Sequence, residues 1–462
     1  MNGQMDIFSI GKEPLKIKNK IRLIELFAGY GSQALSLKYL GVPFEHHRIC
    51  EWAVPSIQAY KDLHFTDDNT DYSKDLSIEQ VVDFLVERGI STDYNKPSPR
   101  KYIERLGNKA RTIYNNIIAT NNLVSVCNVK GQDLEITETD KYTYILTYSF
   151  PCQDLSNAGL KKGMEKGSGT RSGLLWEVER ILSECENKPH ILLMENVPDV
   201  IGEKNRKSFD QWVARLDDWG YYSKWQVING TDFEMPQHRK RCFMVSVLGD
   251  YYYQFPYPNG CTLRLKDLLE HNVEEKYYLS EQALSGCLNT TFESGRLENR
   301  IAHNVGITPL CARDYKGPKL VLEPIACEIR VDEGIRTFEN NYMGTLRTID
   351  ACGCKHIIEP QLVGGFGEKK SNGGTQWYQQ DRVYSTDTVA MAHCASIPSG
   401  SYNYLDNKRV RKLTPREAFR LMGVSDEDFD KVAQNQSNSS LYHLAGDSII
   451  TNCLMAIFKE ML

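Results

Sequence analysis

Short strand-like runs alternate with stretches of helical period through the first half of the chain. The strand candidates are Ile21–Phe27, Glu45–Cys50, Tyr144–Phe150, Ile191–Met194 and Cys242–Leu248. Helical stretches such as Leu174–Cys185 separate them, and the helix after the first strand is expected to end at Gly41. Strands and helices that alternate in this way predict an α/β fold, in which helices cover both faces of a parallel sheet.

A long polar segment interrupts this alternation between about residues 55 and 128. Its pattern predicts a largely helical insertion that lies outside the sheet. The segment carries basic side chains at Lys96, Arg100, Lys101, Arg105, Lys109 and Arg111. Such a run is more often a solvated helix face than a DNA-binding surface, and the sequence leaves both interpretations open.

The pattern changes again from about residue 270 to residue 407, where short β-like runs are mixed with many Gly, Asn, Thr and Asp residues. Segments that start at Gly306, Met343 and Ser385 share a weak pattern, which fits either a repeat or ordinary hairpins with similar turns. Helical patterning returns after residue 408. We therefore expect a first domain over residues 18–258, a smaller β-rich domain over 270–407, and a C-terminal segment, 408–462, that rejoins the first domain.

The composition is that of an ordinary globular protein, with 41% hydrophobic, 10% aromatic and 25% charged residues. Its 55 Lys and Arg residues against 60 Asp and Glu give a net charge of −5 over 462 residues. Any contact with nucleic acid must therefore come from a local basic surface. We find no signal peptide and no apolar stretch of membrane-spanning length, which predicts a cytoplasmic protein without membrane contact.

The 13 cysteines are scattered along the chain, and no two of them form a C-x-x-C pair. This spacing favours reduced thiols over a disulfide framework or a zinc site, and we expect no bound metal. A reduced cysteine at a suitable place in the fold can serve as a nucleophile.

A glycine-containing turn, Ala28-Gly29-Tyr30-Gly31, directly follows the first strand candidate. Glycines at this place let a ligand come close to backbone N–H groups. Glu51 ends the second strand candidate, where a carboxylate suits a ribose diol. The third glycine of a dinucleotide fingerprint is missing, which favours S-adenosylmethionine over a cofactor with a pyrophosphate. Asp133 fits either the adenine amino group or an ordinary surface position.

Three further polar segments lie at predicted strand ends. Cys152 follows a buried strand in Phe150-Pro-Cys-Gln153, and Glu195 ends another in Glu195-Asn-Val197. A basic run, Gln237-His-Arg-Lys-Arg241, leads into the strand candidate at Cys242. Open parallel sheets bind their ligands at the carboxyl edge, so these segments together predict a catalytic site.

These five motifs, with three others, resemble the DNA (cytosine-5) methyltransferases of bacterial and phage restriction-modification systems. The matching segments are Phe27-Ala-Gly-Tyr-Gly31, Glu51-Trp52, Phe150-Pro-Cys-Gln153, Gly169-Thr-Arg-Ser-Gly173, Glu195-Asn-Val197, Gln237-x-Arg239-x-Arg241, Arg411-Lys-Leu-Thr-Pro-Arg-Glu417 and Ala445-Gly-Asp-Ser-Ile449. They occur in the family's order from about Ile21 to Leu462. Their residues are most similar to those of the mollicute branch, some of whose members methylate CpG. The resemblance implies a Rossmann-like, S-adenosylmethionine-dependent methyltransferase sheet with an inserted target-recognition domain.

The resemblance also implies the catalytic residues. Cys152 would add to carbon 6 of the target cytosine, which makes carbon 5 nucleophilic enough to accept a methyl group. Glu195 would hydrogen-bond the ring at N3 and the exocyclic amine, and Arg239 would contact the cytosine carbonyl with Arg241 as support. The sequence does not identify the base that removes the proton from carbon 5.

A further set of residues is assigned to the cofactor by the same resemblance. Phe27 would pack on the adenine, Glu51 would bind the ribose and Trp52 would stack nearby, while Ser448 and Ile449 would close the methionine end. The expected cofactor residues are Phe27, Ala28, Gly29, Tyr30, Gly31, Glu51, Trp52, Asp133, Pro151, Ser448 and Ile449. At Asp447 this chain departs from the Asn that is usual in the family, which leaves the role of that residue open.

The implied partner is double-stranded DNA, from which the target cytosine must be flipped into the site. Residues 270–407 would then read base edges, and the candidate DNA contacts are Gln153, Gln237, Thr388 and Thr345. A cognate restriction endonuclease is a possible partner, and we expect a monomer. The product of the cofactor would be S-adenosylhomocysteine.

Two other functions remain as alternatives at this point. An RNA cytosine-5 methyltransferase shares the fold but has a smaller recognition region. A DNA-binding relative without activity would have lost at least one of Cys152, Glu195 and Arg239. An adenine methyltransferase would need an Asn/Asp-Pro-Pro-aromatic segment where this chain has Pro151-Cys152-Gln153, and a dehydrogenase would need the missing glycine.

Overall fold

The structure is a computed structural model that describes residues 11–152, 154–155, 163–277 and 413–462, together with the backbone of short strands between residues 327 and 412. Three of the candidate DNA contacts, Gln153, Thr345 and Thr388, lie outside the described residues, as does most of the weak repeat.

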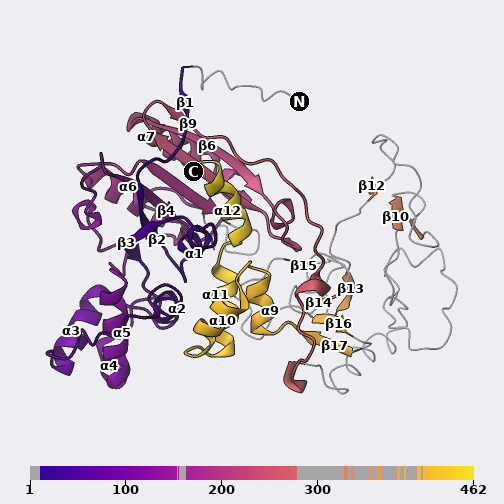
Figure 1. Ribbon diagram of the computed structural model, residues 1–462, viewed down its shortest axis with the longest axis horizontal. Coiled ribbons are helices and arrows are strands. Elements are labelled where there is room, and N and C mark those ends of the chain that lie inside the picture. The colour runs from indigo at the N-terminus through magenta and orange to yellow at the C-terminus, as the bar shows by residue number, and fades with distance from the viewer. Residues whose placement is uncertain are drawn as a thin grey trace.

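A six-stranded sheet forms the centre of the molecule (Figure 1). Its strands are β2 (Lys20–Leu26), β3 (Phe44–Cys50), β4 (Tyr142–Tyr148), β5 (Ile191–Asn196), β6 (Tyr221–Ile228) and β8 (Arg241–Leu248), in the spatial order β3-β2-β4-β5-β8-β6. The first four strands in that order are parallel, whereas β8 runs antiparallel to both of its neighbours. The five predicted strands are confirmed within about two residues. The prediction of a parallel sheet is wrong for β8, which is antiparallel to its neighbours, and β6 was not predicted.

Side chains on the sheet alternate between two apolar cores. On β4, Ile145 packs into one core and Leu146 into the other, and Leu193 and Leu192 on β5 divide in the same way. The helices α1 (Ser32–Tyr39) and α12 (Thr451–Lys459) contribute to the first core, and α6 (Leu175–Glu184) and α7 (Arg206–Asp218) to the second. Strands buried on both faces explain why the sequence shows apolar runs rather than strict alternation.

Between β3 and β4 the chain forms a separate helical unit, at the lower left of Figure 1. It consists of α2 (Val54–His64), α3 (Ile78–Arg88), α4 (Arg100–Arg105) and α5 (Asn108–Ala119). These helices enclose a core of their own, which includes Val81, Leu85 and Ile113. A capping box at Ser77 starts α3, and Gly89 in a left-handed conformation ends it.

Two of the basic residues in this unit have structural partners. Arg100 pairs with Asp83 and Glu104, and Arg111 donates hydrogen bonds to the carbonyl oxygens of Ser73 and Leu76. The contacts of Arg100 and Arg111 therefore fit the interpretation of a solvated helix face.

The C-terminal helices return to the sheet. They are α9 (Pro415–Arg420), α10 (Asp426–Ala433), α11 (Asn438–Asp447) and α12, shown in yellow in Figure 1. Helix α12 packs beside α1, and the Tyr253 hydroxyl donates a 3.0 Å hydrogen bond to the carbonyl oxygen of Ile457. The segment 413–462 thus completes the first core.

One helical stretch of the described chain, Asn438–Lys459, is long and apolar enough to cross a membrane by length and composition. The expectation that the chain holds no such stretch is wrong by this measure. Most of it, 72%, is buried inside the protein, where its apolar side chains fill the core between α1 and the sheet.

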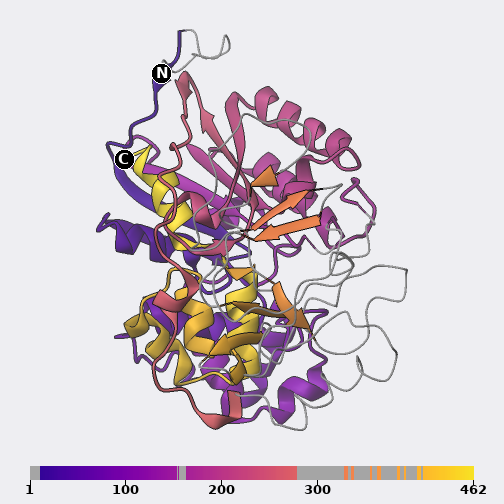
Figure 2. The same cartoon turned by 90° about the vertical axis from the view of Figure 1, so that its right-hand side faces the viewer.

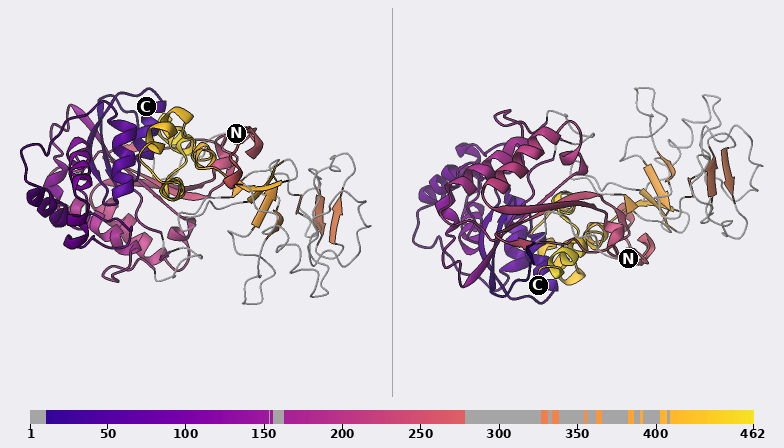
Figure 3. Two further views of the ribbon diagram at one scale, coloured as in Figure 1. Left: turned by 90° about the horizontal axis from the view of Figure 1, so that it is seen from below. Right: turned by 90° about the horizontal axis from the view of Figure 1, so that it is seen from above.

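Short strands between residues 327 and 412 lie to one side of the central sheet (Figures 1 and 3). They are β10 (Cys327–Arg330), β11 (Gly334–Thr337), β12 (Cys354–Lys355), β13 (Leu362–Gly365), β14 (Arg382–Ser385), β15 (Ala390–Met391), β16 (Asn403–Asp406) and β17 (Arg409–Lys412). Strand β15 pairs in parallel with β7 (Gln237–His238), which links this region to the segment before β8.

The remaining described elements are short. Strand β1 (Glu13–Pro14) pairs with β9 (Tyr251–Tyr252). The 3₁₀ helices are η2 (Gly131–Leu134), η3 (Ser172–Leu174), η4 (Pro198–Ile201), η5 (Gly230–Asp232), η6 (Leu265–Leu268) and η7 (Glu275–Tyr277). Figure 2 shows the sheet and its helices from the side of the short strands.

Candidate active site at the carboxyl edge of the sheet

The topology gathers the predicted site at one edge of the sheet. Strands β2, β3, β4 and β5 are parallel, so the turns after Leu26, Cys50, Tyr148 and Asn196 all leave the same edge. Strand β8 runs the other way and pairs Cys242 with Asn196, so its first residue, Arg241, begins at this edge. Residues separated by some 200 positions in the chain therefore meet there.

The glycine turn after β2 adopts a backbone that only certain residues tolerate. Phe27, Gly29 and Gly31 have φ values of 58°, 56° and 82°. A Cβ atom on Gly31 would lie 2.6 Å from both His64 Nε2 and the Tyr60 ring, so this position has room only for glycine. The turn passes directly into α1, and it leaves Phe27 half-buried beside the edge.

Glu51 is buried at the end of β3 and holds the glycine turn. Its Oε2 accepts a 2.9 Å hydrogen bond from the backbone N–H of Gly29, and its Oε1 accepts a 2.7 Å bond from that of Ala53. Burial raises the pKa of this carboxyl to about 7, against the two backbone hydrogen bonds, which lower it. A carboxylate with spare acceptor capacity and half-buried Phe27 and Trp52 nearby fits a nucleoside ligand.

Asn122 is a residue of this site that the sequence did not reveal. Its amide group accepts from the Glu51 N–H at 3.0 Å and donates to the Glu51 carbonyl at 2.8 Å. A short parallel bridge between Ile49 and Asn122 brings it there. The only sequence signal is an Asn after a predicted helix, and its partner lies 71 residues earlier.

The C-terminal segment contacts the glycine turn and the start of α1. The backbone N–H of Ile449 donates to Ser32 Oγ at 3.3 Å, at the start of α1. Tyr30 is buried and stacks on Phe419 of α9, with 5.5 Å between the ring centroids. Ser448 and Ile449 thus lie next to the glycine turn, as the motif order implied.

Asp133 has its hydrogen-bond partners within η2 and on β3. Its carboxylate accepts a hydrogen bond from the Lys130 N–H within η2, and its carbonyl accepts from Arg48. Arg48 precedes the end of β3 by two residues, so η2 lies back along the strand from Glu51. This arrangement favours the surface interpretation of Asp133 over contact with adenine.

The turn that carries Cys152 is fixed from two neighbouring elements. Asn196 at the end of β5 donates to the carbonyl oxygen of Phe150 at 2.9 Å. Ser172, in the Gly169–Gly173 motif, donates to the carbonyl oxygen of Pro151 at 2.7 Å. The two bonds pin the backbone on either side of the Pro151 peptide and hold Cys152, which is partly exposed, at the edge.

Charged side chains surround the Cys152 thiol. Burial raises the pKa of the thiol above its ordinary value, Arg241 opposes this, and the charges of Glu195 and Asp447 add to it. Arg241 Nε lies 3.0 Å from Glu195 Oε1, and both side chains are at least four-fifths buried. Burial also raises the pKa of Glu195, against the nearby Arg241 and Arg239.

Arg239 has a different environment from Arg241. It is 4% exposed, and its guanidinium donates to the carbonyl oxygens of Gly446 at 2.8 Å and Ser448 at 2.7 Å. These bonds satisfy carbonyl groups at the end of α11 and tie the C-terminal segment to the chain before β8. The family resemblance predicted that Arg239 contacts the cytosine carbonyl, whereas in the structure its guanidinium donates to Gly446 and Ser448.

Gln237, a predicted DNA contact, and Asp447, whose role the sequence left open, have different surroundings. Gln237 is fully buried and its amide nitrogen lies 3.4 Å from the carbonyl oxygen of Leu421, so the structure places it in the interior and not on a DNA-facing surface. Asp447, in contrast, is exposed at the end of α11 and pairs with His443 at 3.1 Å.

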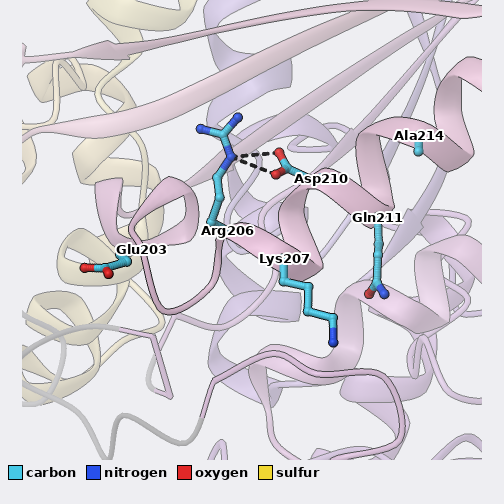
Figure 4. Close-up of a pocket in the computed structure, with 6 residues that line it drawn as sticks. All are labelled: Glu203, Arg206, Lys207, Asp210, Gln211 and Ala214. Atoms are coloured by element: carbon cyan, nitrogen blue, oxygen red, sulfur yellow. Dashed lines mark hydrogen bonds and ion pairs between the residues drawn. The ribbon is translucent and has the colours of Figure 1, made fainter.

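A shallow surface depression lies along the start of α7 (Figure 4). It is lined by Glu203, Arg206, Lys207, Asp210, Gln211 and Ala214. Arg206 is paired with Asp210 across one turn of the helix, and none of the predicted site residues borders this depression. Within the described chain, no group of three or more His, Cys, Asp or Glu side chains is arranged to hold a metal ion.

The family profile and the relatives that match this chain are all methylases or methyltransferases. A profile of the family described as C-5 cytosine-specific DNA methylase matches residues 106–462. Type II methyltransferase M2.ScrFI of Lactococcus lactis subsp. cremoris is 30% identical over 446 residues, which cover 96% of this chain and 99% of the relative. Orphan methyltransferase M.SssI of Spiroplasma monobiae is 33% identical over 336 residues, 69% of this chain and 84% of the relative.

A solved structure supports the fold. The S. pombe Dnmt2 methyltransferase superposes with a TM-score of 0.53 over 96% of this chain and 98% of its own, at 12% sequence identity. The predicted α/β methyltransferase sheet with helices on both faces is confirmed by this likeness.

Proposed function

The chain belongs to the C-5 cytosine-specific DNA methylase family, and we propose that it methylates carbon 5 of a cytosine in duplex DNA with Cys152 as the nucleophile. The observation that carries the proposal is that Cys152, in the turn after β4, lies at the same edge of the sheet as the ion pair between Glu195 of β5 and Arg241 of β8. This set provides a nucleophile, a hydrogen-bonding carboxyl and a cation for one planar ring.

Cys152 is the group that makes the cytosine reactive. Its thiolate adds to carbon 6 and forms a carbon–sulfur bond, and the electron pair of the 5,6 double bond becomes available at carbon 5. After methylation a base removes the proton from carbon 5, the electron pair restores the double bond, and the thiolate leaves. The cytosine must be flipped out of the duplex to reach Cys152.

Glu195 and Arg241 polarise the ring. A carboxyl whose pKa is raised by burial can donate a proton toward N3, which draws electrons from carbon 6 and assists the addition of Cys152. Arg241 lies against Glu195, and we assign the contact with the cytosine carbonyl to Arg241. Arg239 already donates to Gly446 and Ser448, so we assign it a positioning role.

The cofactor residues follow from the same edge. S-adenosylmethionine, when bound, supplies the methyl group to carbon 5. Glu51 would accept hydrogen bonds from the ribose diol, Phe27 and Trp52 would flank the adenine, and Ser448 and Ile449 would border the methionine end. Asp133 is left out of this set because its partners lie within η2 and on β3, back along the strand from Glu51.

The test of the proposal is transfer of labelled methyl groups to duplex DNA, followed by bisulfite sequencing to identify the modified base and its sequence context. Cys152→Ser is expected to reduce the rate by at least about a thousandfold. A covalent complex with DNA that contains 5-fluorocytosine should form with the wild type and not with the variant. Methylation at the wild-type rate by Cys152→Ser would contradict the mechanism.

The remaining expectations concern partners and place. We infer that the protein acts as a monomer in a bacterial cytoplasm, either with a cognate restriction endonuclease or as a solitary or phage-borne enzyme. The bacterial origin of both relatives supports a bacterial host for this protein. Modification of tRNA without modification of duplex DNA in the same assay would favour the RNA alternative.

A further inference from the structure

The helical unit between β3 and β4 sends one loop back to the edge that holds the site. This loop, residues 91–98, is called the Tyr94 loop below. It is rooted beside the end of β3, because Ser91 donates to the carbonyl oxygen of Trp52 and accepts from the N–H of Val54, both at 2.8 Å. Its other end closes on Ile90, whose carbonyl accepts from the Ser98 N–H at 2.8 Å.

The tip of the loop is held on the C-terminal segment. The Tyr94 ring stacks on His443 of α11, with 3.9 Å between the centroids and 16° between the planes. Its hydroxyl is near Ser56 of α2 and Ser440 of α11. Tyr94 has a φ of 60°, an unfavourable value for a side chain of this size, so the contacts at the tip must outweigh its cost.

A third contact joins the loop to the turn that carries the nucleophile. Arg171 donates a 2.6 Å hydrogen bond to Asn95 Oδ1. Arg171 directly precedes Ser172, which holds the carbonyl of Pro151. The side chain of Asp93 accepts from the Asn95 N–H at 2.9 Å and thereby fixes the backbone at Asn95.

The three contacts surround the cofactor edge. One lies next to Trp52, one on α11 a turn before Ser448, and one beside the Pro151 turn, and all three places are predicted cofactor residues or their neighbours. Burial raises the pKa of the Tyr94 phenol, and the negative charges of Glu51 and Asp447 raise it further.

We propose that the Tyr94 loop forms the outer wall of the cofactor site and slows the release of S-adenosylmethionine and S-adenosylhomocysteine. This inference rests on the proposed function of that site. Tyr94 acts as a positioning residue through His443, which also pairs with Asp447 beside Ser448. The stack and the Asn95–Arg171 bond must open for the cofactor to exchange.

Dissociation rates measured by stopped-flow fluorescence test the inference. Tyr94→Ala removes the stack and is expected to raise the dissociation rate of both ligands at least tenfold and the KM for S-adenosylmethionine severalfold, with kcat at saturation lowered no more than twofold. Tyr94→Phe keeps the ring and should stay close to the wild type. Tyr102→Ala, an exposed site on α4 of the same unit, is the matched control.

Hydrogen exchange of the wild-type protein gives an independent readout that does not depend on the folding of a variant. Backbone amides of the Tyr94 loop should become protected when S-adenosylhomocysteine binds, and a distant helix such as α7 should not. Unchanged exchange in the loop, or a dissociation rate of Tyr94→Ala within twofold of the wild type, would overturn the inference. Either result would leave the proposed function intact if the wild type still methylates DNA, whereas absence of methylation would count against the function itself.

Discussion

Burial gives the carboxyl groups of this site their chemistry. Glu51 and Glu195 both lie at strand ends where few water molecules reach them, and burial raises the pKa of each. A raised pKa favours the proposed role of Glu195 and opposes that of Glu51. In the proposed mechanism, a proton on Glu195 helps it donate to a cytosine ring, whereas Glu51 accepts best from a ribose diol when it is ionised.

Glu51 therefore predicts a pH dependence of cofactor binding. Its pKa of about 7 in the free protein means that the carboxylate is formed as pH rises through 7, and the diol binds that ionised form. The affinity for S-adenosylhomocysteine should be constant above pH 8 and fall by up to about tenfold per pH unit well below 7. Isothermal titration calorimetry from pH 5.5 to 8.5 measures this.

Glu51→Gln supplies the control for that experiment. The variant should bind more weakly at pH 8 and lose most of the pH dependence, because the amide does not titrate. A slope that persists unchanged in Glu51→Gln would assign the titration to another group.

Asp447 predicts a change in the reactivity of Cys152. Its negative charge raises the pKa of the thiol, so Asp447→Asn should lower that pKa and move the pH profile of Cys152 alkylation to lower pH. Alkylation by iodoacetamide near pH 7.5 should become severalfold faster. Glu427→Gln, at an exposed position on α10, is a suitable control, and equal profiles for Asp447→Asn and the wild type would contradict the prediction.

At the scale of elements, the turn between β2 and α1 decides how the site is built. Its residues Phe27, Gly29 and Gly31 share positive φ values, which turn the chain sharply enough for α1 to pack on the sheet while the backbone of Gly29 faces Glu51. Only Gly31 is also crowded, because His64 and Tyr60 approach the place where a Cβ would stand.

This difference predicts unequal costs of two similar substitutions. Gly29→Ala meets only the cost of its backbone conformation, about 1 kcal/mol of unfolding free energy. Gly31→Ala adds a clash with buried aromatic side chains and should cost about 3 kcal/mol. Denaturation in urea measures both, and equal losses would show that the neighbours of Gly31 yield without strain.

Elements were predictable where their pattern is local. The buried strands and α1 follow from apolar runs and glycine positions, and their observed bounds agree within about two residues. Strand β6 escaped prediction because much of it, Tyr221–Ile228, is only half-buried and carries Ser223 and Lys224. A mixed strand at the edge of a sheet has no run of apolar residues to reveal it.

At the scale of the whole molecule, the C-terminal segment and the chain before β8 depend on each other. Arg239 carries this dependence through its two hydrogen bonds to the end of α11. Arg241, two residues later, faces Glu195 instead. We therefore propose that Arg239 serves stability and that Arg241 serves the chemistry.

Substitution of each arginine distinguishes these roles. Arg239→Ala should lose about 3 kcal/mol of unfolding free energy, because two buried carbonyl groups lose charged donors. Arg241→Ala should cost less stability, because Glu195 can take up a proton when its partner is lost, and should lower kcat about a hundredfold to a thousandfold. Thermal unfolding and single-turnover methyl transfer measure the two effects, and the opposite pattern would restore the assignment of Arg239 to the cytosine carbonyl.

The sequence by itself predicted five of the six strands of the sheet, the glycine turn and the candidate catalytic residues. Buried strands and tight turns impose their own local patterns, and a catalytic motif such as Phe150–Gln153 is contiguous. It did not predict the partners of Asn122, the different contacts of Arg239 and Arg241, or the elements that the Tyr94 loop contacts. Those depend on contacts between residues up to some 350 positions apart, which only the packing of the folded chain brings together.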